Sequence, residues 1–231
     1  FRSKALRHGN SGCTRRGFAA RGFVVLCACG MGMAVAAASY ADTIAALTQA
    51  RDKEMRTYYR YMDFARHARA EGYRGIAYLF TAFASSELIH AQNFGRILSR
   101  LGVELQPLAK EATSAPGATR DNLLAAVDSE LESIDRLYPA LLERLKPEAH
   151  ADAIATVRHA WASEKQHRDI IQKIRRWSPG FFEQVARTID EKTGAYFVCQ
   201  LCGSTTHAVP RDKCPVCAMP PLHYRRIEIP G

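Results

Sequence analysis

The chain has 231 residues, of which 47% are hydrophobic and 24% charged, a composition typical of a folded globular protein and not of a disordered or fibrous one. Its formal net charge of +9 would point to nucleic acid if the basic residues were spread evenly, but six of them fall within residues 1–41, which contain no Asp or Glu. The remaining 26 basic and 23 acidic residues nearly balance, so we expect no nucleic-acid binding.

Residues 1–41 have the composition of a signal peptide. A basic region precedes an uncharged run over residues 22–38, and residues 39–41 (SYA) carry the small side chains that signal peptidase requires. Residues 14–18 (TRRGF) resemble the twin-arginine export signal. We therefore expect export, with the protein in the periplasm. A lipid anchor on Cys29 and an uncleaved membrane anchor are the alternatives.

The next part of the chain has helical periodicity. Over residues 42–176 apolar side chains recur at three- and four-residue spacing, and the pattern breaks at Gly72, over residues 102–117, at Pro147 and over residues 177–180. These breaks separate four long helices with a long middle connection, as in a ferritin-like four-helix bundle. The expected segments are a signal peptide (1–41), a ferritin-like bundle (42–178), a linker with a short helix (179–194) and a small C-terminal module (195–231).

Two half-patterns of metal ligands repeat within the predicted bundle. Each consists of a lone Glu followed 33 or 34 residues later by Glu-x-x-His, whose two side chains lie about 60° apart around the helix and can reach the same metal ion. Four carboxylates in a bundle core would be costly without cations, and the set is that of a carboxylate-bridged di-iron site. The candidate ligands, which are also the candidate catalytic residues, are Glu54, Glu87, His90, Glu130, Glu164 and His167.

Two tyrosines are placed to support these ligands. Tyr61 follows Glu54 by two helical turns, and Tyr138 follows Glu130 by just over two turns, so each phenol can face the bundle axis. We expect them to hydrogen-bond the ligating carboxylates. The alternative is that both rings only fill the core.

The C-terminal module contains two Cys-x-x-Cys pairs. The other three cysteines of the chain fall within residues 1–41, so the sequence predicts no disulfide framework. The spacing predicts a tetrahedral four-thiolate site that supplies much of the folding free energy of this short module. Iron is the redox-active interpretation and a zinc ribbon the structural one. The predicted ligands are Cys199, Cys202, Cys214 and Cys217.

Gly203 and Pro215 make the module similar to rubredoxin, except that Ala218 stands where rubredoxins usually carry Gly. If that position requires a positive φ, an alanine there is strained.

Residues 42–231 as a whole resemble rubrerythrin, a ferritin-like di-iron domain fused to a rubredoxin-like tail. The resemblance implies two non-haem irons in the bundle, a third iron at the four cysteines, and reduction of hydrogen peroxide to water. Electrons would come from a reductase or small redox protein through the rubredoxin-like iron. It also implies a homodimer in which the module of a partner subunit docks on the bundle. The segments that carry the resemblance are Arg60-Tyr61, Phe64-Ala65, Glu71-Gly72-Tyr73, Glu87-Leu88-Ile89-His90-Ala91, Leu137-Tyr138-Pro139 and Glu164-Lys165-Gln166-His167.

One position departs from the family pattern. Rubrerythrins usually carry a further Glu three residues after the third-helix ligand, and this chain has Ser133 there. In the family that carboxylate exchanges with the first-motif His as iron changes oxidation state. We therefore expect His90 to stay bound in both states, in a more symmetric site closer to that of bacterioferritin. Glu132 is a poor substitute because one helical step turns it about 100° away.

Two other functions are compatible with these ligands. One is a different di-iron oxidase, such as a ferroxidase that uses dioxygen. The other is a non-catalytic metal-binding protein or electron carrier, which zinc at the four cysteines would favour.

Overall fold

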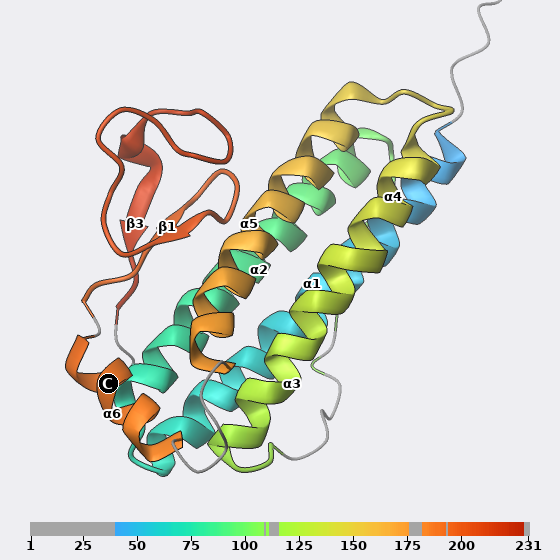
Figure 1. Cartoon of the computed structure of the whole chain (residues 1–231). Helices are drawn as coiled ribbons and strands as arrows, with labels where there is room; N and C mark the ends of the chain where they lie inside the picture. Colours follow the sequence, from blue (N-terminus) through green and yellow to red (C-terminus); the bar gives the residue numbers. More distant parts are fainter. Residues whose placement is uncertain (1–39, 109, 111–115, 176–181, 193, 229–231) are drawn as a thin grey trace, which may run out of the picture. The chain divides into compact units, whose positions relative to one another are not determined.

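A computed structural model describes residues 40–108, 110, 116–175, 182–192 and 194–228 (Figure 1). Apart from Tyr40 and Ala41, the predicted signal peptide lies outside the described residues, as does the predicted break at 177–180. Within the described ranges, no helix is both long and apolar enough to cross a membrane.

The first helical hairpin consists of α1 (Ala41–Ala70) and α2 (Arg74–Arg100). Gly72 turns the chain between them with a φ of +90°, a left-handed conformation that side chains other than glycine's rarely adopt. The amide of Tyr73 then donates to the carbonyl of Ala68, which satisfies one of the last carbonyls of α1. The break predicted at this glycine is therefore the turn of the hairpin.

The second hairpin contains α3 (Thr119–Glu132), the π-helical turn η1 (Ser133–Leu137), α4 (Tyr138–Leu145) and α5 (Ala151–Arg175). The predicted third helix is thus continued through a π turn that the sequence analysis did not anticipate. A π turn weakens the regular ladder of helical hydrogen bonds. The indole Nε1 of Trp161 on α5 donates to the carbonyl of Ile134 at 2.9 Å, so this part of the turn has a partner on the neighbouring helix.

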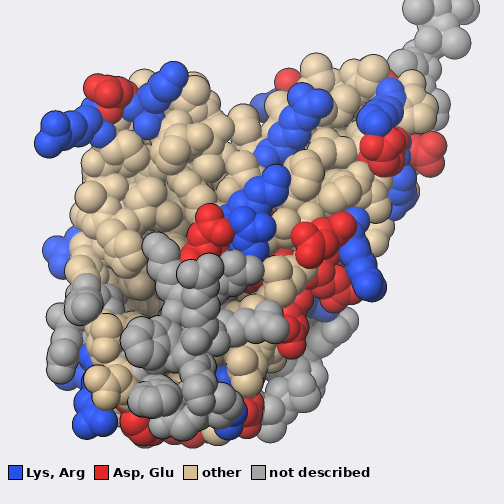
Figure 2. All heavy atoms as spheres, viewed as in Figure 1, with Lys and Arg blue, Asp and Glu red and all other residues tan. Residues whose placement is uncertain are grey.

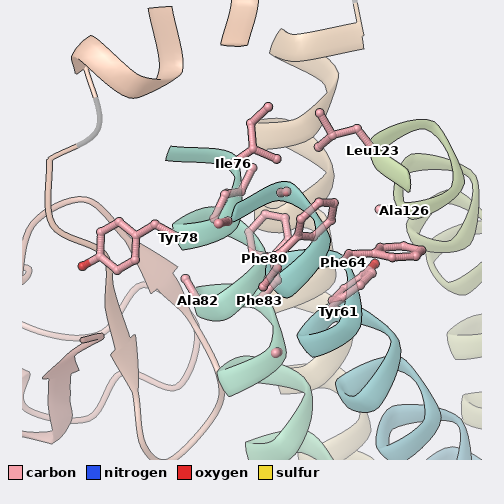
Figure 3. Close-up of a cluster of buried hydrophobic side chains, with 14 of the residues drawn as sticks. Tyr61, Phe64, Ile76, Tyr78, Phe80, Ala82, Phe83, Leu123 and Ala126 are labelled. Carbon is pink, nitrogen blue, oxygen red and sulfur yellow. The ribbon is translucent and has the colours of Figure 1, made fainter. Parts of the chain in front are cut away.

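The apolar core of the bundle forms two clusters, with a polar layer between them. On α1, Ala50 belongs to one cluster and Tyr61 to the other, and the buried Glu54 lies between them in the sequence. On α2, Ala84 of one cluster and Phe94 of the other lie on either side of the Glu87-x-x-His90 motif in the sequence. Figure 3 shows the aromatic cluster around Tyr61. The candidate ligands therefore occupy the middle of the bundle and are enclosed from both ends.

The C-terminal part begins with α6 (Phe182–Lys192) and continues into a three-stranded antiparallel sheet in the order β2-β1-β3. Its strands are β1 (Phe197–Cys199), β2 (Thr205–Thr206) and β3 (Tyr224–Arg226), and the 3-10 turn η3 (Pro221–His223) precedes β3. The prediction of a mainly α chain, with a four-helix bundle and a small β module, is confirmed.

The module contacts the bundle of its own chain along α2. The phenol of Tyr78 donates to the carbonyl of Ile227 at 2.7 Å and accepts from the amide of Tyr196 at 3.1 Å. The two tyrosine rings also meet edge to face, with centroids 5.0 Å apart. On the face in Figure 2, Lys and Arg side chains lie beside Asp and Glu side chains and do not merge into one basic patch.

Candidate metal centres

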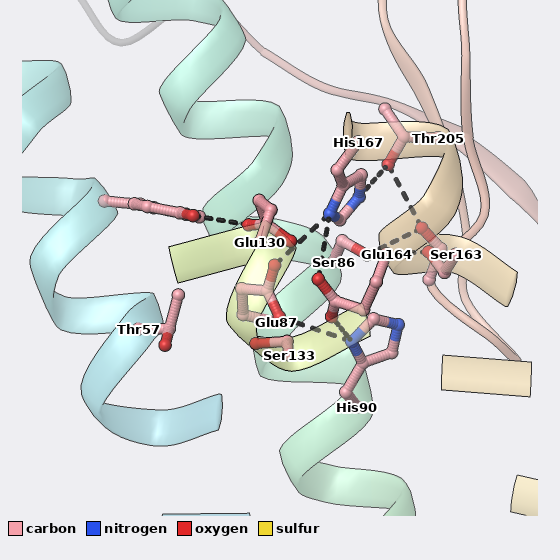
Figure 4. Close-up of polar contacts among 12 residues, drawn as sticks. Thr57, Ser86, Glu87, His90, Glu130, Ser133, Ser163, Glu164, His167 and Thr205 are labelled. Atoms are coloured by element: carbon pink, nitrogen blue, oxygen red, sulfur yellow. Dashed lines mark hydrogen bonds and ion pairs between the residues drawn. The ribbon is translucent and has the colours of Figure 1, made fainter. Parts of the chain in front are cut away.

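The structure brings the six predicted bundle ligands together in the polar layer. Figure 4 labels Glu87, His90, Glu130, Glu164 and His167 among them. They form two overlapping groups of four, and in each group the ligand atoms lie within 4.8 Å of one another. Both groups share Glu87 and Glu164, which can therefore bridge two metal ions. The remaining members complete the two groups, with Glu54 and His90 in one and Glu130 and His167 in the other. All six are at most 1% exposed.

The hydrogen bonding of this cluster fits metal ions. Four of its buried polar atoms make no hydrogen bond of regular geometry, namely Oε1 of Glu87, Oε2 of Glu130, Oε2 of Glu164 and Nδ1 of His167. Unpaired buried polar atoms are costly, and these are all atoms that can donate a lone pair to a cation. Carboxylate oxygens and imidazole nitrogens suit iron. The residues present therefore fit a pair of iron ions.

The cysteine module holds the first histidine in a ligating orientation. Nε2 of His90 lies 3.1 Å from the carbonyl oxygen of Cys202, which can only accept a hydrogen bond, so Nε2 carries the proton. Nδ1 faces the carboxylates, at 3.3 Å from Glu87 and 3.2 Å from Glu164. When the ring is neutral, its lone pair is on Nδ1 and points into the cluster, as a metal ligand requires.

The second histidine is held in the same way through a hydroxyl. Thr205 Oγ1 donates to the carbonyl of Gly203 at 3.1 Å, so it accepts from Nε2 of His167 at 3.2 Å. Nδ1 of His167 lies 3.3 Å from Glu87. Sequence reasoning missed Thr205 because a threonine in a short strand has no metal-site signature. Both histidine ligands thus rest on the cysteine module.

Gly203 brings the backbone of the module directly against the bundle. Its φ of +81° is left-handed, and a Cβ on it would lie 2.3 Å from Nε2 of His90 and 2.5 Å from Oγ of Ser86. Oγ of Ser86 donates to the Gly203 carbonyl at 2.7 Å. Only glycine fits this backbone position and this contact.

The two tyrosines are paired crosswise. The phenol of Tyr61 donates to Oε1 of Glu130 on the opposite hairpin, and Tyr138 donates to Oε1 of Glu54 at 2.7 Å. Burial raises the pKa of both phenols well above its usual value, so both stay protonated and act as donors. Each lone glutamate of one half is thus supported by the tyrosine of the other half.

In the metal-free cluster, the pKa values of the candidate ligands are shifted in different directions. Burial raises the pKa of Glu54 and Glu130 well above the usual value. Burial and the charge of Glu164 also raise the pKa of Glu87, but hydrogen bonds with both histidines lower it to about 2. Burial lowers the pKa of His90, whereas its contacts with Glu164 and Glu87 raise it to about 10. A metal ion that binds Nδ1 must therefore displace a proton.

Ser133 is buried beside the cluster, but its hydroxyl is used within its own helix. Oγ donates to the carbonyl of Ser129 at 2.9 Å. Glu132 is exposed to solvent. Among the described residues, the two groups contain no seventh carboxylate from this helix.

The four cysteines of the module lie together as a second candidate centre. Their sulfurs are within 4.8 Å of one another, with 3.9 Å between those of Cys199 and Cys217 and 3.6 Å between those of Cys202 and Cys214. Tetrahedral coordination with metal–sulfur bonds of about 2.3 Å separates the sulfurs by about 3.8 Å. The described geometry therefore suits one four-thiolate metal ion.

Ala218 has a φ of +58°, in the left-handed region where an alanine is strained. We expect Ala218→Gly to stabilise the metal-loaded module by about 0.5–1 kcal/mol, because relief of strain exceeds the greater freedom of glycine in the unfolded chain. The midpoint of denaturant-induced loss of the thiolate–metal absorbance measures this. Ala149→Gly, at a φ of +49° in the bundle, is the matched control and should leave the module unchanged. An earlier midpoint for Ala218→Gly would contradict the expectation.

Comparison with protein families gives a match to the family described as Rubrerythrin over residues 45–175, more than half of the chain. The chain belongs to the rubrerythrin family. Rubrerythrin-2 of Clostridium acetobutylicum is 30% identical to this chain over 175 residues, covering 75% of this chain and 90% of the relative. Nigerythrin of Nitratidesulfovibrio vulgaris is 28% identical over 164 residues, covering 70% and 74% of the two chains.

Solved structures agree with the fold of this chain. A nigerythrin structure in a mixed-valence state aligns with a TM-score of 0.66 at 23% identity, covering 84% of this chain and 90% of the other. A fully reduced, all-ferrous nigerythrin aligns with a TM-score of 0.65 at 24% identity. Family membership and the carboxylate–histidine cluster together support a di-iron protein of the oxidative-stress type.

Proposed function

We propose that the chain is a non-haem di-iron peroxidase that reduces hydrogen peroxide to water. The balanced reaction takes one peroxide, two electrons and two protons to two waters. Electrons enter at an iron held by the four cysteines and pass to the di-iron site in the bundle, where peroxide accepts them. The observation that carries this proposal is the contact between the two centres, in which Nε2 of His90 meets the carbonyl of Cys202.

That contact joins one ligand of each candidate centre. Cys202 supplies a thiolate to the module site, and its backbone carbonyl lies 3.1 Å from the imidazole of His90. A path of covalent bonds and one hydrogen bond therefore leads from the sulfur to the bundle. A second path runs from Gly203 through the hydroxyl of Thr205 to His167.

When bound, the two irons would supply the redox equivalents that cleave the O–O bond. The protein residues hold the ions, fix the ligating carboxylates and exclude bulk water. Glu87 and Glu164 belong to both groups of ligand atoms and would hold the two ions close to each other. Tyr61 and Tyr138 fix the carboxylates of Glu130 and Glu54 and remain protonated. The two apolar clusters exclude bulk water from the ends of the site.

Metal content and the optical spectrum test whether both sites hold iron. We expect three irons per chain and the visible thiolate-to-iron bands of a ferric four-cysteine site. Zinc at the cysteines, together with no peroxide turnover by the iron-loaded bundle, would contradict the peroxidase and support a non-catalytic metal-binding protein.

Ser133 favours a second candidate function, an oxidase or ferroxidase that uses dioxygen. Its hydroxyl is bound to Ser129, and it cannot provide the carboxylate that the family pattern places here. We expect Ser133→Glu to shift the preference of the reduced protein toward peroxide over dioxygen by roughly tenfold or more, because it restores the anionic ligand that the pattern of the peroxide-reducing family carries at this position. Stopped-flow oxidation of wild type and variant by each oxidant measures the ratio. Faster oxidation of wild type by dioxygen than by peroxide would support the oxidase.

We also propose that the protein is exported, that a reductase or small redox protein reduces it, and that it forms a homodimer.

Changing Arg15 and Arg16 together to Lys should trap the precursor in the cytoplasm, because the twin-arginine pathway reads that pair. Cell fractionation with immunoblotting measures the result. Normal export of this variant would exclude the twin-arginine route and leave general secretion.

A further inference from the structure

Lys53 lies at the edge of the carboxylate cluster. It immediately precedes Glu54 on α1, and its Nζ is 3.3 Å from Oε2 and 3.5 Å from Oε1 of that glutamate. The Glu54 side chain is fully buried, whereas that of Lys53 is 20% exposed. The ammonium group is therefore turned inward onto a candidate metal ligand.

The charge of Lys53 acts across the cluster and not only on its neighbour. Burial raises the pKa of Glu54, and the ammonium group opposes that rise. Burial also acts to raise the pKa of Glu130 and Glu164, which belong to α3 and α5, and the charge of Lys53 opposes that effect as well. Its contact is with Glu54, and its charge acts on ligands from three helices.

The second half of the site also has a lysine next to a candidate ligand, but it follows that ligand in the sequence and has a different orientation. Lys165 immediately follows Glu164 on α5, and its Nζ lies 3.5 Å from the centroid of the Trp161 ring. That ammonium group is held by an aromatic face. Adjacency to a ligand therefore does not by itself bring a lysine into the cluster, and the orientation of Lys53 is a specific feature.

We propose that Lys53 is a built-in counter-cation of the carboxylate cluster, a positioning residue that competes with the metal ions for Glu54. In the metal-free protein it stabilises buried negative charge. In the loaded protein it repels the ions, and it repels ferric ions more than ferrous ones. Lys53 thereby weakens metal binding and favours the reduced pair. This inference rests on the proposed metal site but not on the reaction with peroxide.

The test compares Lys53→Met with wild type, using Mn²⁺ alone as the probe, because Mn²⁺ prefers carboxylate and imidazole to thiolate ligands. Lys53→Met should bind Mn²⁺ about tenfold more tightly, because a nearby like charge is removed from a site of low dielectric. Its metal-free form should melt at a lower temperature than metal-free wild type. A residue with only a structural role would lower both stability and affinity, so the opposite signs are diagnostic.

Two further variants separate charge from shape. Lys53→Arg keeps the cation and should retain the wild-type Mn²⁺ affinity, and Lys165→Met removes a lysine next to a ligand but outside the cluster and should also leave it unchanged. With iron, Lys53→Met should shift the one-electron oxidation equilibrium about tenfold toward the ferric state, which corresponds to about 59 mV. Equal or weaker Mn²⁺ binding by Lys53→Met, or equal behaviour of the Met and Arg variants, would overturn the proposal.

If metal-free Lys53→Met does not fold, its loaded form still tests the proposal through the rate of Mn²⁺ release to a chelator. Slower release than from wild type supports competition by Lys53, and equal or faster release contradicts it. Failure of wild type itself to bind Mn²⁺ would overturn both the metal site and this inference. A loss of peroxide turnover with the affinity pattern intact would affect only the proposed function.

Discussion

Gly203→Ala is expected to lower peroxide turnover by roughly 10²-fold while both metal centres stay loaded, because a displacement of about 1 Å between reacting partners can have an effect of that size. A methyl group at this position would lie 2.3 Å from Nε2 of His90 and 2.5 Å from Oγ of Ser86, so the module must move away from the bundle. The contact between Cys202 and His90 would then be lost. Single-turnover oxidation of the four-thiolate iron by peroxide measures the effect.

Gly102→Ala is the matched control for this experiment. Gly102 has nearly the same φ, +82°, but a Cβ there would meet nothing within 4 Å. Both variants should lose similar stability from backbone strain, and only Gly203→Ala should lose electron transfer. Equal turnover by the two variants would show that the module does not deliver electrons through this contact.

Cys214→Ser is expected to unfold the module and to weaken metal binding in the bundle, although the residue lies in neither hairpin. Structural four-ligand sites supply on the order of 10 kcal/mol of folding free energy, more than this small core can replace. The core around the cysteines contains Tyr224, whose phenol donates to the Cys214 sulfur at 3.3 Å. Hydrogen exchange should therefore lose protection over β1–β3 and keep it over α1 and α2.

The same variant should reduce the affinity of the bundle for metal by about 10–100-fold, the range found when an outer partner of a ligating histidine is removed. Here both histidines would lose their partners on Cys202 and Thr205 together. Mn²⁺ titration measures the loss, and Leu222→Ala, at a module side chain that is 74% exposed, is the control. An unchanged Mn²⁺ affinity would show that the module does not orient these histidines.

The clustering of the candidate ligands could be predicted because each candidate follows from a short local rule. Glu-x-x-His fixes two side chains on one helix face, and a repeat of the motif on a second hairpin leaves little else that four carboxylates can do in a core. The cysteine spacing is equally local. These rules need no knowledge of how the helices are arranged.

The remaining parts of the site depend on contacts between segments that are distant in sequence. Tyr138 follows Glu130 by one residue more than Tyr61 follows Glu54, and the π turn η1 accommodates that extra residue, so both phenols reach the cluster. Neither the π turn nor the crosswise pairing has a sequence signature. The roles of Lys53 and Thr205 likewise depend on side-chain orientation and on docking of the module, which spacing cannot predict.

The measurement that tests the central claim most directly is a single-turnover reaction of the fully reduced, iron-loaded protein with one equivalent of hydrogen peroxide. Absorbance of the four-thiolate iron reports its oxidation during the reaction. We predict that this iron is oxidised in a first-order step whose rate does not depend on protein concentration and falls in Gly203→Ala. If peroxide oxidises the bundle while the four-thiolate iron stays reduced, electrons do not pass from the module to the di-iron centre and the proposed function is wrong.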